Sequence, residues 1–278
     1  MKRVVVTGMS AITPIGQDWT SVASKLSNGE TGVRYMHEWE DIDGLNTKLG
    51  APVEDFQIPG HYTRKLIRSM GRGSIMATRA TELALGQAGL LEHELTTSGK
   101  MGVSYGSSSG SPDAIAEFGT MQIHNSTGGL NANSYIKMMS HTASINLAVF
   151  FKLKGRVYTT SSACTSGSQG IGYAYEAIKN NKQAAMVAGG SEELCAPQAA
   201  VFDTLFATST INDAPSSTPR PFDKARDGLV IGEGACTLIL EELDHAKARG
   251  AEILAEVVGF GTNCDGTHIT QPSKDTMR

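Results

Sequence analysis

Cys164 is the residue of this sequence whose surroundings best fit chemical reactivity. It lies in TTSSACTSGSQG (159–170), after a β-prone run at 155–160 and before a helical pattern that begins at 166. The unpaired N–H groups and the dipole at the start of a helix favour a thiolate over a thiol. The neighbouring residues are nearly all small, which leaves room for a substrate. The pattern favours a nucleophilic cysteine, with a cysteine that only fills the core as the alternative.

The helix predicted after Cys164 contains three glycines, Gly167, Gly170 and Gly172. Each glycine costs up to ~1 kcal/mol relative to alanine inside a helix, so we expect this helix to press tightly against other backbone. A strand, a nucleophile and a helix in this order resemble the elbow of hydrolases, although A-C-T-S-G differs from their G-x-S-x-G. We therefore predict a rigidly held turn at Cys164.

Two other segments rich in small residues could bind phosphate groups. VVVTGMSAITPIG (4–16) begins like a dinucleotide-binding strand, but it lacks G-x-G-x-x-G, and Pro14 interrupts the expected start of the helix. GSSSGS (106–111) lacks the Lys-Ser/Thr of a P-loop, so a loop that lines a pocket is the better interpretation. The four cysteines form neither a CxxC pair nor a zinc-like cluster with histidine. We therefore expect neither a bound metal nor a bound cofactor.

The composition is that of a globular protein. The 278 residues carry a net charge of −4, and no basic block predicts nucleic-acid binding. A signal peptide is disfavoured because Thr7 and Gly8 interrupt the first apolar run, and no apolar stretch approaches the ~20 residues of a membrane span. Free cysteines are typical of a reducing compartment, so we expect a cytoplasmic protein.

Strand-like and helix-like segments alternate along the chain, which predicts an α/β protein with helices covering a largely parallel sheet. The sequence contains no short repeat and no clear linker, so a single domain is favoured. We expect strands at 3–8, 100–107, 155–160, 183–192, 236–243 and 252–261, and helices at 21–29, 74–90, 140–155, 166–181 and 244–250.

Four segments occur in order and together resemble the β-ketoacyl-acyl-carrier-protein synthases of the type I/II class, which belong to the thiolase superfamily. They are SSACTSGSQGIG (161–172), MVAGGSEEL (186–194), TPRPFDKARDGLVIGEGA (218–235) and LEELDHAKARGAEILAEVVGFG (240–261). The resemblance covers essentially the whole chain and marks it as an N-terminal portion of such an enzyme. SSAC and EELCAPQAAVFD are closer to type I, without deciding between the two types.

The resemblance implies a thiolase-like layered αβαβα fold, with the N-terminal half at 1–251 and the start of the C-terminal half at 252–278. It implies a 3-oxoacyl-[acyl-carrier-protein] synthase of fatty acid biosynthesis. In that reaction Cys164 takes an acyl chain, which then undergoes decarboxylative Claisen condensation with malonyl carrier protein. The implied partners are the acyl carrier protein and a second copy, or a chain that supplies the missing half. Phosphopantetheine arrives on the carrier protein, so no resident cofactor is implied.

The resemblance also implies roles for individual residues that match the family's motifs. Cys164 is the implied nucleophile, and its own N–H supplies half of the oxyanion hole. Ser109, Met139 and Phe202 are implied to line the acyl pocket, and Thr270 is implied to lie near the phosphopantetheine arm. The block that contains Asp223, Arg226 and Asp227 is expected to bury these charges in mutual pairs.

The family's catalytic histidines, its lysine and its mobile glycine loop belong to the second half and have no match among these 278 residues. We therefore expect negligible condensation from this chain alone. One alternative is a non-catalytic dimer partner of the chain-length-factor kind, although such partners typically replace the nucleophile. Another is a degradative thiolase, which the RPFDKARDG block disfavours.

Overall fold

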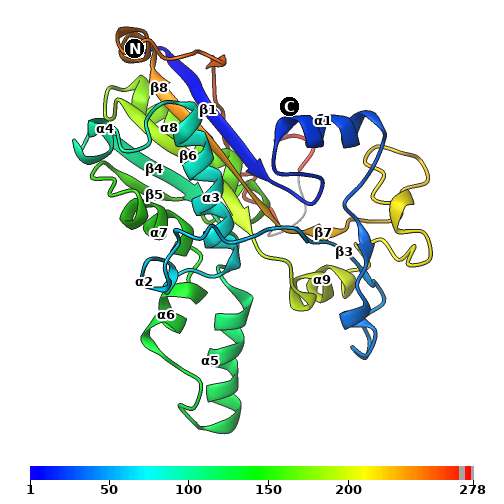
Figure 1. The fold of residues 1–278 in the computed structure, drawn as a ribbon. Coiled ribbons are helices and arrows are strands. Elements are labelled where there is room, and N and C mark those ends of the chain that lie inside the picture. The colour runs from blue at the N-terminus through cyan, green and yellow to red at the C-terminus, as the bar shows by residue number, and fades with distance from the viewer. Residues whose placement is uncertain (269–272, 277–278) are drawn as a thin grey trace.

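The chain is described by a computed structural model that covers residues 1–268 and 273–276. A six-stranded sheet with the order β5-β4-β6-β8-β1-β9 runs through it (Figure 1). The strands are, in chain order, β1 (Val4–Ile12), β4 (Met101–Gly106), β5 (Val157–Thr159), β6 (Ala185–Glu192), β8 (Gly234–Glu242) and β9 (Ala255–Val257). Helices separate most of these strands along the chain, so the predicted α/β class is confirmed.

The strand directions correct one prediction. β4 pairs in parallel with β5 and with β6. β8 pairs antiparallel with β6 and β1, and β1 pairs antiparallel with β9. The expectation of a largely parallel sheet is therefore wrong. Apolar runs indicate that a strand is buried on both faces, but they do not give its direction. β8 begins beside the end of β6, where Glu192 pairs with Gly234, so after the connection 193–233 the chain runs back alongside β6 in the opposite direction.

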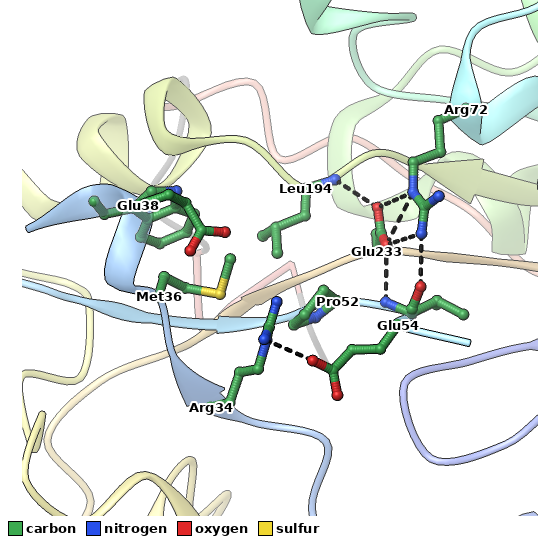
Figure 2. Close-up of a pocket in the computed structure, with 10 residues that line it drawn as sticks. Arg34, Met36, Glu38, Pro52, Glu54, Arg72, Leu194 and Glu233 are labelled. Atoms are coloured by element: carbon green, nitrogen blue, oxygen red, sulfur yellow. Dashed lines mark hydrogen bonds and ion pairs between the residues drawn. The ribbon is translucent and has the colours of Figure 1, made fainter. Parts of the chain in front are cut away.

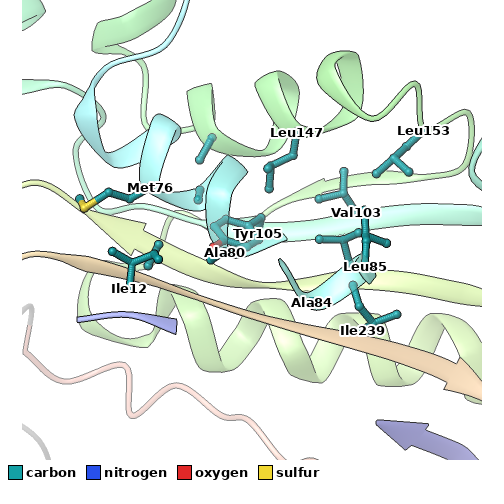
Figure 3. Packing of buried hydrophobic residues seen from close by; sticks show 14 of the residues in the cluster. Ile12, Met76, Ala80, Ala84, Leu85, Val103, Tyr105, Leu147, Leu153 and Ile239 are labelled. Carbon is teal, nitrogen blue, oxygen red and sulfur yellow. The ribbon is translucent and has the colours of Figure 1, made fainter. Parts of the chain in front are cut away.

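Helices cover both faces of the sheet. α3 (Arg72–Gln87) and α7 (Thr142–Phe150) lie over one face, where they pack against Tyr105 and Ile239 (Figure 3). α8 (Ser166–Lys179) lies over the other face and packs against neighbouring residues of the same strands, such as Leu240. Successive strand residues point to opposite faces, so each strand contributes to both cores. Complete burial of a leucine or isoleucine side chain stabilises the fold by about 1.5–3 kcal/mol.

A three-stranded sheet lies beside the main one (Figure 1). Its strands are β2 (Arg34–Tyr35), β3 (Leu49–Ala51) and β7 (Ile231–Gly232). α9 (Ala196–Asp203) packs on this small sheet, because Ala199 lies in one apolar cluster with Ile231. This unit supplies one wall of the cavity described below.

α5 (Pro112–His124) and α6 (Ala132–Met138) project away from the sheet (Figure 1). Sequence analysis assigned no element here, although the local signals were present. Pro112 opens α5, Asn125 ends it with a φ of 48°, and Asn131 begins α6 with a capping box. The remaining elements are α1 (Trp19–Ser27), η1 (His37–Trp39), α2 (Arg64–Ile67), α4 (Glu94–Thr97), η2 (Ala163–Thr165), η3 (Pro215–Ser217) and α10 (Leu243–Ala248).

Most predicted elements lie within a few residues of their observed bounds. The largest differences are the helix expected over 140–155, observed as Thr142–Phe150, and the last strand expected over 252–261, observed as Ala255–Val257. The division of the chain at residue 251 stays a prediction. Among the described residues, no helix combines the length and apolar character needed to cross a membrane.

Candidate active site at Cys164

The turn that carries Cys164 is held in an unusual backbone conformation. Ala163 has a φ of 50°, in the left-handed region that residues with a Cβ seldom adopt. The hydroxyl of Ser166 donates to the carbonyl of Ala163 at 2.7 Å and accepts the N–H of Ser162 at 2.9 Å. These bonds fix both sides of the strained residue. Such strain persists where the surrounding structure over-determines the backbone, often at functional sites.

Cys164 itself lies in η2, one residue before the N-cap of α8, and its side chain is exposed. The neighbouring N–H of Thr165 donates to the carbonyl of Ser162 at 3.2 Å. Within the described part of the chain, no backbone acceptor bonds the N–H of Cys164. An exposed sulfur beside a free backbone donor is the arrangement needed to attack a carbonyl and to stabilise the resulting oxyanion.

The glycines of α8 show how closely this helix packs. A Cβ at Gly170 would lie 2.8 Å from the carbonyl oxygen of Gly189, and one at Gly172 would overlap the ring of Phe260. The predicted close approach of α8 to other backbone is therefore confirmed at Gly170. At Gly167 the nearest atoms are at ordinary contact distance, 3.8 Å, so this glycine is not required by packing.

A mostly apolar cavity of about 870 Å³ opens beside Cys164. Its walls come from the end of β1, the loop after β4, the first turns of α8, the α9 helix and the segment 229–238. Apolar cavities of this size with a few polar groups are typical of small-molecule sites.

The structure brings three of the predicted site residues together. Cys164, Ser109 and Phe202 all line this cavity. Met139 is absent from the lining and caps the C-terminus of α6. It nevertheless lies next to the cavity loop, because a Cβ at Gly110 would be 2.7 Å from the Met139 carbonyl oxygen. Thr270 lies outside the described residues.

Sequence analysis missed the carboxylate that organises the loop after β4. Glu192 accepts hydrogen bonds from the Ser107 hydroxyl at 3.1 Å, from the Ser108 N–H at 2.7 Å and from the Ser108 hydroxyl. Gln198 of α9 donates to the Ser109 hydroxyl at 2.9 Å. The partners are about 85 residues apart in sequence, so no local pattern could reveal them.

Glu193, the next residue, is buried on the other side of the same loop. It accepts the N–H of Gly73 at 2.9 Å and the hydroxyl of Ser111 at 3.3 Å. Burial, helped by the carboxylates of Asp113 and Glu233, raises the pKa of Glu193 to about 7 against the effect of these two hydrogen bonds. Glu193 therefore ties the start of α3 to the start of α5 with a carboxyl that titrates near neutral pH.

A smaller cavity of about 540 Å³ (Figure 2) shares Glu233 with the lining of the first. Glu233 lines both cavities and accepts two-pronged hydrogen bonds from Arg72, at 2.8–3.1 Å. Arg34 pairs with Glu54 at 2.6 Å across the same cavity. Each guanidinium in Figure 2 faces a carboxylate, so among the described residues that line this cavity neither arginine is an unpaired cation.

A second thiol, Cys236, lines the main cavity. Desolvation by the surrounding walls raises its pKa, and desolvation also raises the pKa of Cys195 at the start of α9. A raised thiol pKa disfavours the thiolate and slows its reactions. Among the described residues, no cluster of three His, Cys, Asp or Glu side chains could hold a metal ion.

The charges of the RPFDKARDG block correct another prediction. Asp223, Arg226 and Asp227 were expected to be buried in mutual pairs, and all three are exposed. Asp227 accepts the Ser209 hydroxyl at 3.0 Å, and Arg226 donates to the backbone carbonyl of Asp223 at 2.8 Å. The block therefore shapes its loop through hydrogen bonds with backbone and hydroxyl groups, which cost less than buried charges.

The fold and the site are those of the thiolase-like class of condensing enzymes. The chain belongs to the beta-ketoacyl synthase family, since residues 1–246 match the family described as "Beta-ketoacyl synthase, N-terminal domain". The 3-oxoacyl-[acyl-carrier-protein] synthase 1 of Escherichia coli (strain K12) is 37% identical over 276 residues, which are 98% of this chain and 67% of the relative. The chain thus spans about two thirds of that relative's length.

Solved structures agree with this assignment. A beta-ketoacyl synthase from Burkholderia phymatum STM815 is 56% identical, with a TM-score of 0.97 over 100% of this chain and 68% of that one. The AntDE:AntF complex, a type II PKS acyl-carrier protein with its ketosynthase bound to the hexaketide, gives 27% identity and a TM-score of 0.81. It covers 99% of this chain and 67% of that one. The predicted thiolase-like fold is confirmed by these likenesses.

Proposed function

We propose that the full-length protein is a 3-oxoacyl-[acyl-carrier-protein] synthase of fatty acid biosynthesis with Cys164 as its nucleophile. The observation that carries the proposal is the position of Cys164. Its exposed sulfur lies on a strained turn at the start of α8 and opens onto an apolar cavity. The apolar cavity can hold an acyl chain, and the turn presents the sulfur that would attack the thioester carbonyl.

The first half-reaction moves an acyl group between two sulfur atoms. The thiolate of Cys164 attacks the carbonyl carbon of an acyl thioester on the carrier protein, and a carbon–sulfur bond forms. The N–H of Cys164 donates to the oxyanion of the tetrahedral intermediate. The bond to the phosphopantetheine sulfur then breaks, and that thiolate takes up a proton as it leaves. The acyl chain remains on Cys164 as a new thioester.

The cavity gives the acyl chain its place. We propose that Phe202 and Ser109 contact the chain, with Met139 behind the loop that contains Ser109 and Thr270 near the phosphopantetheine arm. The phosphopantetheine is covalently part of the carrier protein, so the proposed reaction uses no resident cofactor. In the second half-reaction, malonyl carrier protein loses CO₂ and its carbanion attacks the Cys164 thioester. The groups that the family uses for that step have no match among the 278 residues, so the step is proposed for a protein that contains them.

The proposed partners are an acyl carrier protein and a second copy of the chain, or a chain that supplies the rest of the fold. The complex of AntDE with AntF supports the first, as a related ketosynthase with its carrier protein. For the second, β5 is an edge strand of the main sheet, and exposed Val157, Ile145 and Val149 lie on it and on α7 beside it. An exposed edge with apolar neighbours favours pairing with another chain.

The test is acylation of the full-length protein by an acyl carrier protein, followed by intact mass and peptide mapping. We expect one acyl group per chain, located on Cys164 and abolished by Cys164→Ala. Cys264→Ala, which removes another exposed thiol, should leave acylation unchanged. Acylation at another residue would refute the assignment of the nucleophile. Acylation without product from malonyl carrier protein would favour a partner that binds chains but does not condense them.

A further inference from the structure

The loop 107–111 connects the parts of the site that sequence analysis identified separately. Ser109 in this loop lines the cavity with Phe202. The hydroxyl of Ser161, three residues before Cys164, donates to the carbonyl of Ser107 at 2.8 Å. The N–H of Ser111 donates to the carbonyl of Lys137 near the end of α6, at 2.9 Å. The position of this loop therefore affects both the cavity and the approach to the nucleophile.

Glu192 holds this loop at one point. Its two carboxylate oxygens accept three hydrogen bonds from Ser107 and Ser108, one of them from a backbone N–H. Ser109 lies farther away, with its hydroxyl 3.5 Å from the carboxylate. Hydrogen bonds to an ionised acceptor are the stronger kind, and a carboxylate accepts without needing to donate. A glutamine at this position keeps one acceptor oxygen for the Ser108 N–H, but it loses the negative charge and the second acceptor oxygen.

The strand pairing explains why Glu192 reaches the loop. β4 and β6 run in parallel, with Gly106 opposite Gly190. The residues that follow these two glycines therefore leave the sheet at the same edge. Glu192 is two residues beyond Gly190, and the serines of the loop follow Gly106 directly. The glutamate is thus placed by rigid β-structure, while the serines that it binds lie in a loop.

We propose that Glu192 is the positioning residue that fixes the loop 107–111, and thereby sets which acyl chain lengths the cavity accepts. This inference rests on the proposed function, since the cavity must hold an acyl chain. Glu192, Ser107 and Ser108 also line the cavity, so Glu192 acts on its wall through these serines and has no part in bond making at Cys164. A long acyl chain contacts more of the cavity wall than a short one does. If the loop 107–111 is no longer held in place, the rate of acylation should therefore fall more for long chains.

The test compares Glu192→Gln with wild type and with Glu252→Gln, an exposed glutamate that serves as the matched control. The full-length protein is acylated from carrier proteins that bear short, medium or long chains. Loss of charge-assisted bonds should slow acylation by long chains about tenfold, as expected for one such bond, and acylation by short chains clearly less. Ser108→Ala removes one donor from the loop side and should give a smaller change in the same direction. In the double variant the two effects should not add.

Amide hydrogen exchange supplies a readout that does not depend on acylation. In Glu192→Gln the amides of Ser108 and Gly110, whose N–H groups donate to Glu192 and to the Ser107 hydroxyl, should exchange faster, and in the control they should not change. If the ratio of long-chain to short-chain acylation rates is unchanged, whether or not all rates fall together, the proposal is overturned. If wild type accepts no acyl chain, the proposed function fails. Unchanged exchange in Glu192→Gln would then also reject Glu192 as the residue that holds the loop.

Discussion

Glu193 makes the stability of this fold depend on pH in a direction that can be stated in advance. Burial raises its pKa from 4.5 to about 7. Between these values the folded protein holds a proton that the unfolded chain has released. The free energy of unfolding therefore falls as pH rises through this window, and it levels off above about pH 7. One pKa unit corresponds to ~1.4 kcal/mol, so the total penalty is about 3 kcal/mol.

Glu193→Gln removes this titration while keeping most of the geometry. A glutamine oxygen can still accept the N–H of Gly73, and its amide can donate to the hydroxyl of Ser111. We therefore expect the variant to match wild type near pH 5 and to exceed its free energy of unfolding near pH 8, by up to ~3 kcal/mol. Ionised Glu193 is the form that burial disfavours, so the gain appears only where the wild-type carboxyl is charged.

The assay is urea unfolding of both proteins between about pH 5 and pH 8, with the difference between them plotted against pH. Other titrating groups cancel in that difference, unless they touch Glu193. The charged neighbours that can contribute are Asp113, Glu233 and Arg72. A difference that stays constant over the whole range would refute the reasoning, because it would show that Glu193 does not titrate there. Glu252→Gln should show no pH-dependent difference.

Three further predictions test the elbow, the helix behind it and a buried ion pair. Iodoacetamide should modify Cys164 faster than Cys264, an exposed thiol outside any helix that serves as an internal reference; equal rates by peptide mapping would show that the turn does not activate the sulfur. Gly170→Ala should lower the free energy of unfolding because its Cβ meets backbone at 2.8 Å, whereas Gly86→Ala, with open space around it, should raise it by up to ~1 kcal/mol. Arg249→Ala removes the guanidinium that binds the fully buried Glu241 at 2.7 Å and leaves it His245 and Thr7 as partners, so it should cost about 1.5–3 kcal/mol in urea unfolding; a cost below ~1 kcal/mol would contradict this.

The sequence predicted the features that depend on neighbouring residues. The turn at Cys164 could be located because strand-prone residues, small residues and helix-forming residues follow one another within twenty positions. The packing of α8 could be predicted because a glycine inside a helix lowers its stability, so Gly170 indicates a position where a larger side chain would not fit. Both arguments use local physical chemistry, and the structure places these residues as expected at Gly170 and at the Cys164 cavity.

The features that sequence analysis missed depend on contacts between distant segments. Glu192 was an ordinary strand-end glutamate until the structure placed it against serines about 85 residues away. The antiparallel direction of β8 could not be read from its apolar residues, because burial on two faces is common to both directions. The exposed charges around Asp223 were expected to be buried because a specific motif suggested a specific ion pair, and a motif alone does not fix side-chain contacts.

The parallel trio β5-β4-β6 explains where the chemistry of this fold is located. Parallel strands place their carboxyl ends at one edge of a sheet, where ligands commonly bind. β5 leads to Cys164, β4 leads to the serine loop, and β6 ends at Glu192. Nucleophile, cavity loop and positioning carboxylate therefore meet because three strands share a direction. The antiparallel strands β8 and β1 complete the sheet and add cavity wall, and their reversal does not disturb this edge.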